Sequence, residues 1–168
     1  MAFYNSPTTE YKCAYIKIID YTDKEKKSEI FDGPLLMAYS NALEYIFEFI
    51  KKKMADFDNN RKVFREMLAN AVFHKDYDSF APITVKLRQD EIEFTNPCKK
   101  EYLDINHLNN FDMPTNPING CLSDIALKTR LMEGQGRGEE TLKKYLGKLD
   151  KKPYELICNI LRVKIPLN

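Results

Sequence analysis

Hydrophobic residues follow two different periods along the chain, and together these periods predict a protein that mixes strands and helices. Alternating or β-branched apolar runs predict strands over 11–21, 29–32, 83–87 and 91–95, and one or two more over 156–165. Spacings of three and four predict helices over 35–53, 61–74, 123–132 and 139–146, with residues 58–60 as a break before the second helix. The 83–95 pair should form a hairpin with one buried and one wet face, ending at Asn96-Pro97 because proline cannot continue a ladder.

The helix over 61–74 carries two rows of side chains. Its apolar residues recur at the spacing of a face packed on a core: Val63, Phe64, Met67, Leu68, Ala71 and Val72. Glu66, Asn70 and His74 stand four apart and form a second row on the same helix. An acid, an amide and an imidazole beside an apolar face suggest the wall of a site. A solvated stripe is the alternative, because helix surfaces are rich in Glu and Asn.

Two later segments have the composition of binding elements. Residues 99–119 should form a long loop, with at most a short helix over 104–108, and such loops are often lids. Gly134, Gly136 and Gly138 then alternate just before a helix, where glycine allows positive φ and helix N–H groups attract anions. Arg137 could add a charge-assisted contact. The same spacing also serves as an ordinary hinge between two helices.

Composition and charge narrow the class of protein. With 168 residues, the chain suits one domain over 11–168 after a short polar linker over 1–10. The net charge of +1 does not favour direct nucleic-acid binding by bulk electrostatics, although a local basic patch stays open. Four scattered cysteines offer no zinc or disulfide pattern and fit a reducing cytoplasm. No apolar run is long enough to span a bilayer, so we expect a cytoplasmic protein without a membrane partner.

Taken together, these motifs resemble the Bergerat, or GHKL, nucleotide-binding fold of gyrase B, histidine kinases and MutL. The most specific stretch is Arg65-Glu66-x-Leu68-x-Asn70-Ala71-x-x-His74-Lys75-Asp76-Tyr77, followed by Ile92-Glu93-x-x-Asn96-Pro97 and Glu133-x-x-Gly136-x-Gly138. This order is similar to the C-terminal ATPase-like domain of bacterial RecG-related or Schlafen/AlbA-type transcriptional regulators. The resemblance implies an α+β two-layer sandwich with a mixed, mostly antiparallel sheet and helices on one face. Residues 11–60 would be its lead-in and 61–168 its motif-bearing core.

The resemblance also implies roles for individual residues. Glu66 would activate water as a general base, and Asn70 would ligate the Mg²⁺ that bridges the phosphates of ATP. The remaining nucleotide contacts would come from His74, Asn96, Gly134, Gly136, Arg137 and Gly138. DNA would be a partner only through an attached N-terminal module that is not in this sequence, and a homodimer would fit the family.

The sequence departs from the family where the adenine is read. Asn96-Pro97-Cys98 stands in place of the relatives' Asp-x-Gly-x-Gly turn, and a neutral amide reads an exocyclic amine less selectively than a carboxylate. Two hypotheses follow: a nucleotide-binding or sensing module with weak ATP hydrolysis at most, or a degenerate scaffold or dimerisation domain that binds no nucleotide. His74 could likewise have a catalytic or ligand role or be a helix cap with a backbone-bonded ring. Asp76 could meet a metal, or simply form a cap or bridge Lys75 or a neighbouring arginine.

Overall fold

The computed structural model describes residues 8, 10–11, 13–111, 118–129, 131, 137–147 and 152–167, with the side chains of 137–139 excepted. Its strands form one six-stranded sheet in the order β2-β1-β3-β4-β6-β5. Only β1 and β3 run parallel, and the other four neighbouring pairs are antiparallel. The strands are β1 Ile16–Asp20, β2 Lys27–Phe31, β3 Ile83–Leu87, β4 Glu91–Pro97, β5 Tyr154–Ile157 and β6 Ile160–Pro166.

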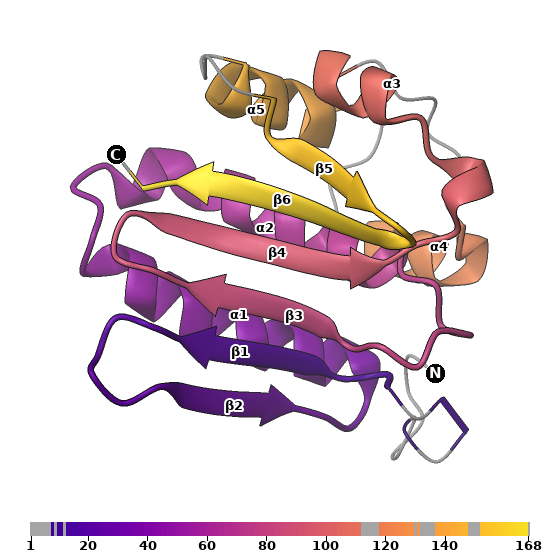
Figure 1. Ribbon diagram of the computed structural model, residues 1–168, viewed down its shortest axis with the longest axis horizontal. Coiled ribbons are helices and arrows are strands. Elements are labelled where there is room, and N and C mark those ends of the chain that lie inside the picture. The colour runs from indigo at the N-terminus through magenta and orange to yellow at the C-terminus, as the bar shows by residue number, and fades with distance from the viewer. Residues whose placement is uncertain are drawn as a thin grey trace.

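The two long helices cover one face of this sheet (Figure 1). They are α1 Leu35–Lys51 and α2 Phe57–Phe73, with α2 between α1 and α5 Arg137–Leu146. A short helix, α3 Ile105–Asn110, contacts β5 at the sheet margin, after the 3₁₀ turn Lys100–Tyr102, and α4 is Gly120–Lys128. The prediction of an α+β protein with a mixed, mostly antiparallel sheet and helices on one face is therefore confirmed.

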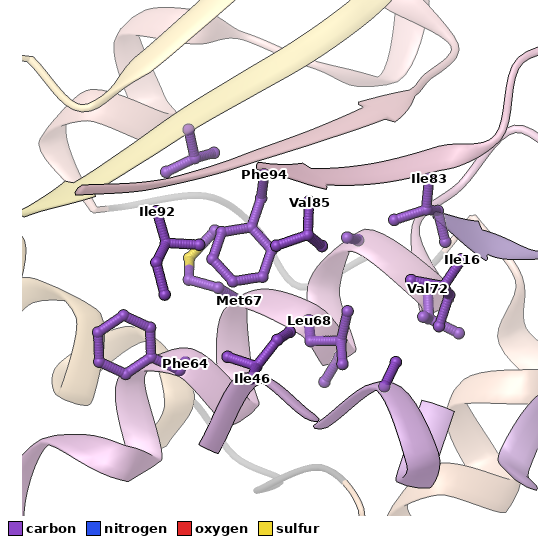
Figure 2. Close-up of a cluster of buried hydrophobic side chains, with 14 of the residues drawn as sticks. Ile16, Ile46, Phe64, Met67, Leu68, Val72, Ile83, Val85, Ile92 and Phe94 are labelled. Carbon is purple, nitrogen blue, oxygen red and sulfur yellow. The ribbon is translucent and has the colours of Figure 1, made fainter. Parts of the chain in front are cut away.

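A continuous apolar core joins the sheet to the long helices (Figure 2). Phe94 projects from β4 toward Met67 and Leu68 of α2, and both helix residues are at most 3% exposed. Alternate residues of the strands supply the sheet side of this core, and they include Ile16, Ile18, Ile83, Val85, Leu87, Ile92, Val163 and Ile165. Burial of this size is the main favourable contribution to folding.

The two edge strands of the sheet, β5 and β2, differ in how their outer edges are covered. At β5 the side chain of Asn109 acts as a substitute strand: its Nδ2 donates to Tyr154 O at 3.1 Å, and its Oδ1 accepts from Tyr154 N–H at 3.1 Å. At the opposite margin, β2 pairs with β1 on one side, and four of its five residues are exposed. An unpaired strand edge presents backbone donors and acceptors to other chains.

Several predicted boundaries are wrong. Residues 58–60 do not precede α2 but form its first turn, where Asn60 N–H and the Asn60 side chain both bond to Asp56 O. Strand β4 continues through Asn96 and Pro97, because its pairing with β3 ends at Thr95 and the missing N–H of Pro97 leaves no bond unmade there. Helix α4 begins at Gly120, three residues early, and β1 is shorter than predicted.

No helix in the described part of the chain has the length and apolar character that crossing a bilayer requires.

Candidate functional site

Glu66 lies on the inner side of α2, close to α1 and to the segment that leads into the glycine-rich turn. Its side chain is 6% exposed, which does not fit the solvated-stripe alternative. The hydroxyl of Tyr39, on α1, lies 3.4 Å from both Arg65 O and Leu131 O. Burial raises the pKa of Tyr39. The nearby charges have smaller effects: Arg65 lowers this pKa and Glu66 raises it. Leu131 therefore lies beside the start of the predicted acid-amide row.

The predicted row ends where α2 ends. His74 is the C-cap of the helix, and its backbone N–H donates to Asn70 O at 3.0 Å, so its predicted capping position is confirmed. No hydrogen bond of the His74 ring to the backbone is found within the described ranges. Burial lowers the pKa of this imidazole, which keeps the ring neutral at pH 7. Asn70 is half-buried, one turn before His74.

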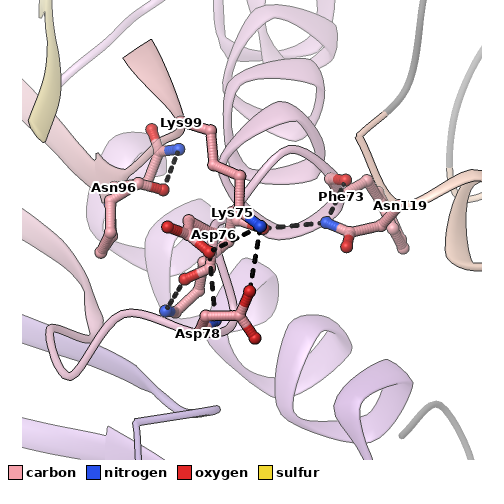
Figure 3. A network of polar contacts seen from close by, with 8 residues as sticks. Phe73, Lys75, Asp76, Asp78, Asn96, Lys99 and Asn119 are labelled. Atoms are coloured by element: carbon pink, nitrogen blue, oxygen red, sulfur yellow. Dashed lines mark hydrogen bonds and ion pairs between the residues drawn. The ribbon is translucent and has the colours of Figure 1, made fainter. Parts of the chain in front are cut away.

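The loop after α2 joins the helix to the end of β4 (Figure 3). Asp76 N–H donates to Pro97 O at 2.9 Å, which fixes the loop against the strand. The Asp76 carboxylate accepts from Asp78 N–H at 3.1 Å and lies 3.8 Å from the ammonium of Lys99. Lys99 also bonds to Asp78 at 2.9 Å. The structure thus assigns Asp76 to a bridge with Lys99 rather than with Lys75 or an arginine.

Lys75 is the least expected residue of this loop, because its side chain is completely buried. Its ammonium donates to Asp76 O at 2.9 Å and lies 5.1 Å from the centre of the Tyr77 ring. Desolvation lowers the pKa of Lys75, although the nearby side chains of Cys13, Asp76 and Asp78 oppose that effect. A buried cation held by a carbonyl and an aromatic face is a strong local positive charge at the end of α2.

Asn119 ties the far end of the 99–119 segment to the same point. Its side-chain Nδ2 lies 2.9 Å from Phe73 O and 2.9 Å from Lys75 O, so one amide group serves two carbonyls at the end of α2. Asn119 is also the residue that precedes α4. The start of α4 is therefore anchored to the end of the helix that carries Glu66 and Asn70.

Asn96 occupies the end of β4, next to this anchored loop. It is 4% exposed, and it follows Ile92 and Phe94 on the face of the strand that the helices cover. Its Nδ2 lies 3.4 Å from Pro97 O, a long and weak hydrogen bond. Burial raises the pKa of the neighbouring Cys98 thiol, whose backbone N–H donates to Asn159 O at 2.9 Å.

The glycine-rich turn can be located only by its two ends. Gly134 and Gly136 lie outside the described residues, whereas Arg137 and Gly138 form the beginning of α5. Leu131 precedes the turn beside Arg65, and α5 follows it, packed on α2 with Tyr145 and Phe64 in ring contact at 6.3 Å. The segment after the turn therefore contacts the helix that carries the predicted row, and Leu131 before the turn is connected to that helix through the Tyr39 hydroxyl.

Three residues that matter to this geometry were missed by the sequence reasoning: Tyr39, Lys75 and Asn119. Tyr39 reads as one more apolar position of α1, and Lys75 reads as part of a polar loop. Asn119 had one usable signal, since Asn is a preferred residue before a helix, although here its side chain bonds to another helix.

Within the described ranges, no group of three His, Cys, Asp or Glu side chains could hold a metal ion by itself.

Comparison with known proteins supports the fold. No family model matches the chain, and no curated protein matches it. Among solved structures, the DIP2311 protein from Corynebacterium diphtheriae matches with a TM-score of 0.65 and 13% sequence identity. The match covers 98% of this chain and 34% of that protein, so the chain corresponds to about a third of the neighbour's length. The same arrangement of strands and helices thus occurs as a part of a larger protein.

Proposed function

We propose that this chain is a nucleotide-binding or nucleotide-sensing module of a bacterial transcriptional regulator, with a Bergerat-type fold. The ligand would lie between the Glu66–Asn70 side of α2 and the beginning of α5. The observation that carries the proposal is the Tyr39 hydroxyl between Arg65 O and Leu131 O, at 3.4 Å from each. It supports a short distance between the acid-amide row and the start of the turn.

The residues at this place have the chemistry that a Mg²⁺-nucleotide requires. The amide oxygen of Asn70 suits a hard cation that keeps most of its ligands as water and phosphate oxygen. The beginning of α5 offers backbone N–H groups and the positive end of the helix dipole to the phosphates. Asn70 would thus recognise the Mg²⁺ ion and the beginning of α5 the phosphates of ATP. A neutral His74 would not repel the cation.

Isothermal titration calorimetry with Mg-ATP tests the proposal. The wild-type protein should release or absorb heat with saturation below millimolar nucleotide, and Asn70→Ala should weaken binding about tenfold or more, as expected for one lost charge-linked contact. Asn59→Ala is the matched control, because Asn59 is exposed on the first turn of the same helix and should leave the affinity unchanged. Absence of heat from the wild-type protein at millimolar nucleotide would remove the proposal.

Hydrolysis is a separate question, which Glu66→Gln addresses. If Glu66 is a general base, this isosteric change should leave nucleotide affinity within about twofold while abolishing any slow release of phosphate. Equal phosphate release by both proteins would instead assign Glu66 to structure.

The alternative is a Bergerat-type scaffold or dimerisation domain that binds no nucleotide. One observation favours it: Asn96, where the family reads the base, donates its amide to Pro97 O and is nearly closed to solvent. This hypothesis predicts no calorimetric signal and a symmetric dimer in sedimentation analysis. A monomer that binds nucleotide tightly would contradict it.

A further inference from the structure

The face of the sheet opposite the long helices carries a concentration of basic side chains that the near-neutral total charge conceals. None of the described helices crosses this face, which Figure 1 presents to the viewer. We propose that the face binds the phosphate backbone of a nucleic acid without reading its sequence. The proposal is independent of nucleotide binding by the site on α2.

Strand register places the basic residues in neighbouring rows. Lys17, Thr84, Thr95 and Arg162 are consecutive cross-strand partners over β1, β3, β4 and β6. Ile19, Lys86, Glu93 and Lys164 form the next row in the same way. Because side chains on one face of a strand recur every second residue, Arg162 and Lys164 follow each other on that face of β6. Lys86 lies on the same face of β3, and Arg88 directly follows the end of that strand.

The spacing of these cations suits a chain of phosphates. Two residues along a strand span about 6.8 Å, and β3 and β6 are two strand spacings, or about 9.6 Å, apart. Two lines of positive charge at such intervals can follow a sugar-phosphate backbone, which is a regular polyanion. The accessible carriers of charge are Lys17, Lys86, Arg88, Arg162 and Lys164, all at least partly exposed.

The acidic residues of this face form ion pairs with basic residues of the same face. Glu93 is 4% exposed, with Lys86 Nζ at 2.6 Å and Arg162 Nε at 3.8 Å from its Oε1. Glu155 pairs with Arg162 at 3.3 Å, and Glu91 with Arg88 at 3.5 Å. Arg162 Nε is buried 3.8 Å from Glu93 without a hydrogen-bond partner in the described part of the protein, so this atom of the guanidinium is not accessible to a ligand.

The composition favours nucleic acid over a protein partner. Protein interfaces have an apolar centre and a polar rim, whereas here the centre is charged and the exposed Ile30 and Ile157 lie on the two outermost strands. Interfaces with nucleic acid are more polar and more positive. Tyr21, at one end of the face, already has Lys26 and Arg88 at 5.0 and 4.9 Å from its ring centre, so contact with phosphates rather than base stacking is expected.

Fluorescence anisotropy with a labelled single strand and a labelled duplex of mixed sequence tests this inference. Binding should be micromolar at about 50 mM salt and weaken steeply toward about 200 mM, with a logarithmic salt slope of about −3 for four neutralised phosphates. The double variant Lys17→Glu/Lys164→Glu should bind at least about tenfold more weakly, with a slope reduced by about 2. Thermal unfolding of each variant shows that it is folded.

A matched double variant distinguishes the effect of this face on binding from the effect of the total net charge. Lys52→Glu/Lys62→Glu makes the same charge change at exposed positions of the helix layer and should leave affinity within about twofold. Glu93→Gln should strengthen binding, because it removes the negative charge from the middle of the rows. Equal losses in the two double variants, no binding by the wild-type protein at low salt, or polyglutamate binding as tight as that of DNA would each overturn the inference.

Discussion

Strand β4 buries side chains on both of its faces, but by opposite means. On the covered face Phe94 is 1% exposed among apolar residues of α2, whereas on the open face Glu93 is 4% exposed under Lys86 and Arg162. Apolar burial is non-directional and scales with area, whereas a buried carboxylate is stable only while its partners stay in place. The same degree of burial therefore predicts different responses to substitution and to pH.

The largest effect is expected from Phe94→Ala. Removing a buried ring leaves a cavity between β4 and α2 and should lower the free energy of unfolding by about 3–5 kcal/mol. Urea denaturation followed by circular dichroism measures the change. Phe80→Ala is the control, because Phe80 is 80% exposed and its removal should have little effect. A loss below 1 kcal/mol for Phe94→Ala would mean that this face repacks.

A smaller loss is expected from Lys86→Met on the opposite face. The substitution keeps the apolar stem but leaves the Glu93 carboxylate with weaker partners, which should remove about 1–2 kcal/mol. Lys86→Met/Glu93→Gln should recover part of that loss, and comparison of the double variant with both single variants gives the coupling free energy of the pair. Additive losses would show that the 2.6 Å contact contributes nothing to stability.

The Glu93 carboxyl on the open face should also make the free energy of unfolding depend on pH in the acidic range. Burial opposes ionisation of Glu93, but the hydrogen bond and charge of Lys86, with the charges of Arg162 and Lys164, hold the pKa of that carboxyl below its usual range. A carboxyl whose pKa is lowered by folding stabilises the protein fully above its unfolded pKa of about 4.3 and loses that contribution as pH falls further. Denaturation curves recorded from neutral to acidic pH should therefore converge for the wild-type protein and Glu93→Gln. Parallel curves would contradict this account.

The smallest effect is expected from Thr95→Val, which keeps the shape of the side chain. It removes the bond from Thr95 Oγ1 to Thr84 O, 3.1 Å long, and should cost about 0.5–1 kcal/mol. Thermal unfolding is sensitive enough to detect it. A gain in stability would mean that strand propensity outweighs the bond.

The sequence predicted those helices and strands whose apolar residues repeat with a regular spacing along a short stretch of chain. The central helix and the 83–95 hairpin were confirmed because their apolar positions repeat within a few residues of one another. The solvent-facing side of the hairpin was predicted correctly, yet Glu93 proved buried because Arg162, which is distant along the chain, covers it together with Lys86 of the neighbouring strand. Pattern reasoning along one strand contains no information about such a neighbour.

The candidate site divides in the same way. The row Glu66, Asn70, His74 follows from helical spacing, and the structure places Glu66 and Asn70 on α2 as predicted, with His74 as the C-cap directly after the helix. The roles assigned to these residues remain predictions, as do those of Asn96, Arg137 and the three glycines. The buried state of Lys75 and the two carbonyl bonds of Asn119 depend on the meeting of α2, β4 and α4 in space, which no local pattern encodes.

The asymmetry of the sheet margins limits how copies of this fold can associate through their backbones. With α3 and the amide of Asn109 lying against the start of β5, β2 is the more open of the two margins among the described residues. Two copies joined beside β2 would each use up that margin. Backbone pairing of this kind would then favour a closed twofold pair over an open-ended array.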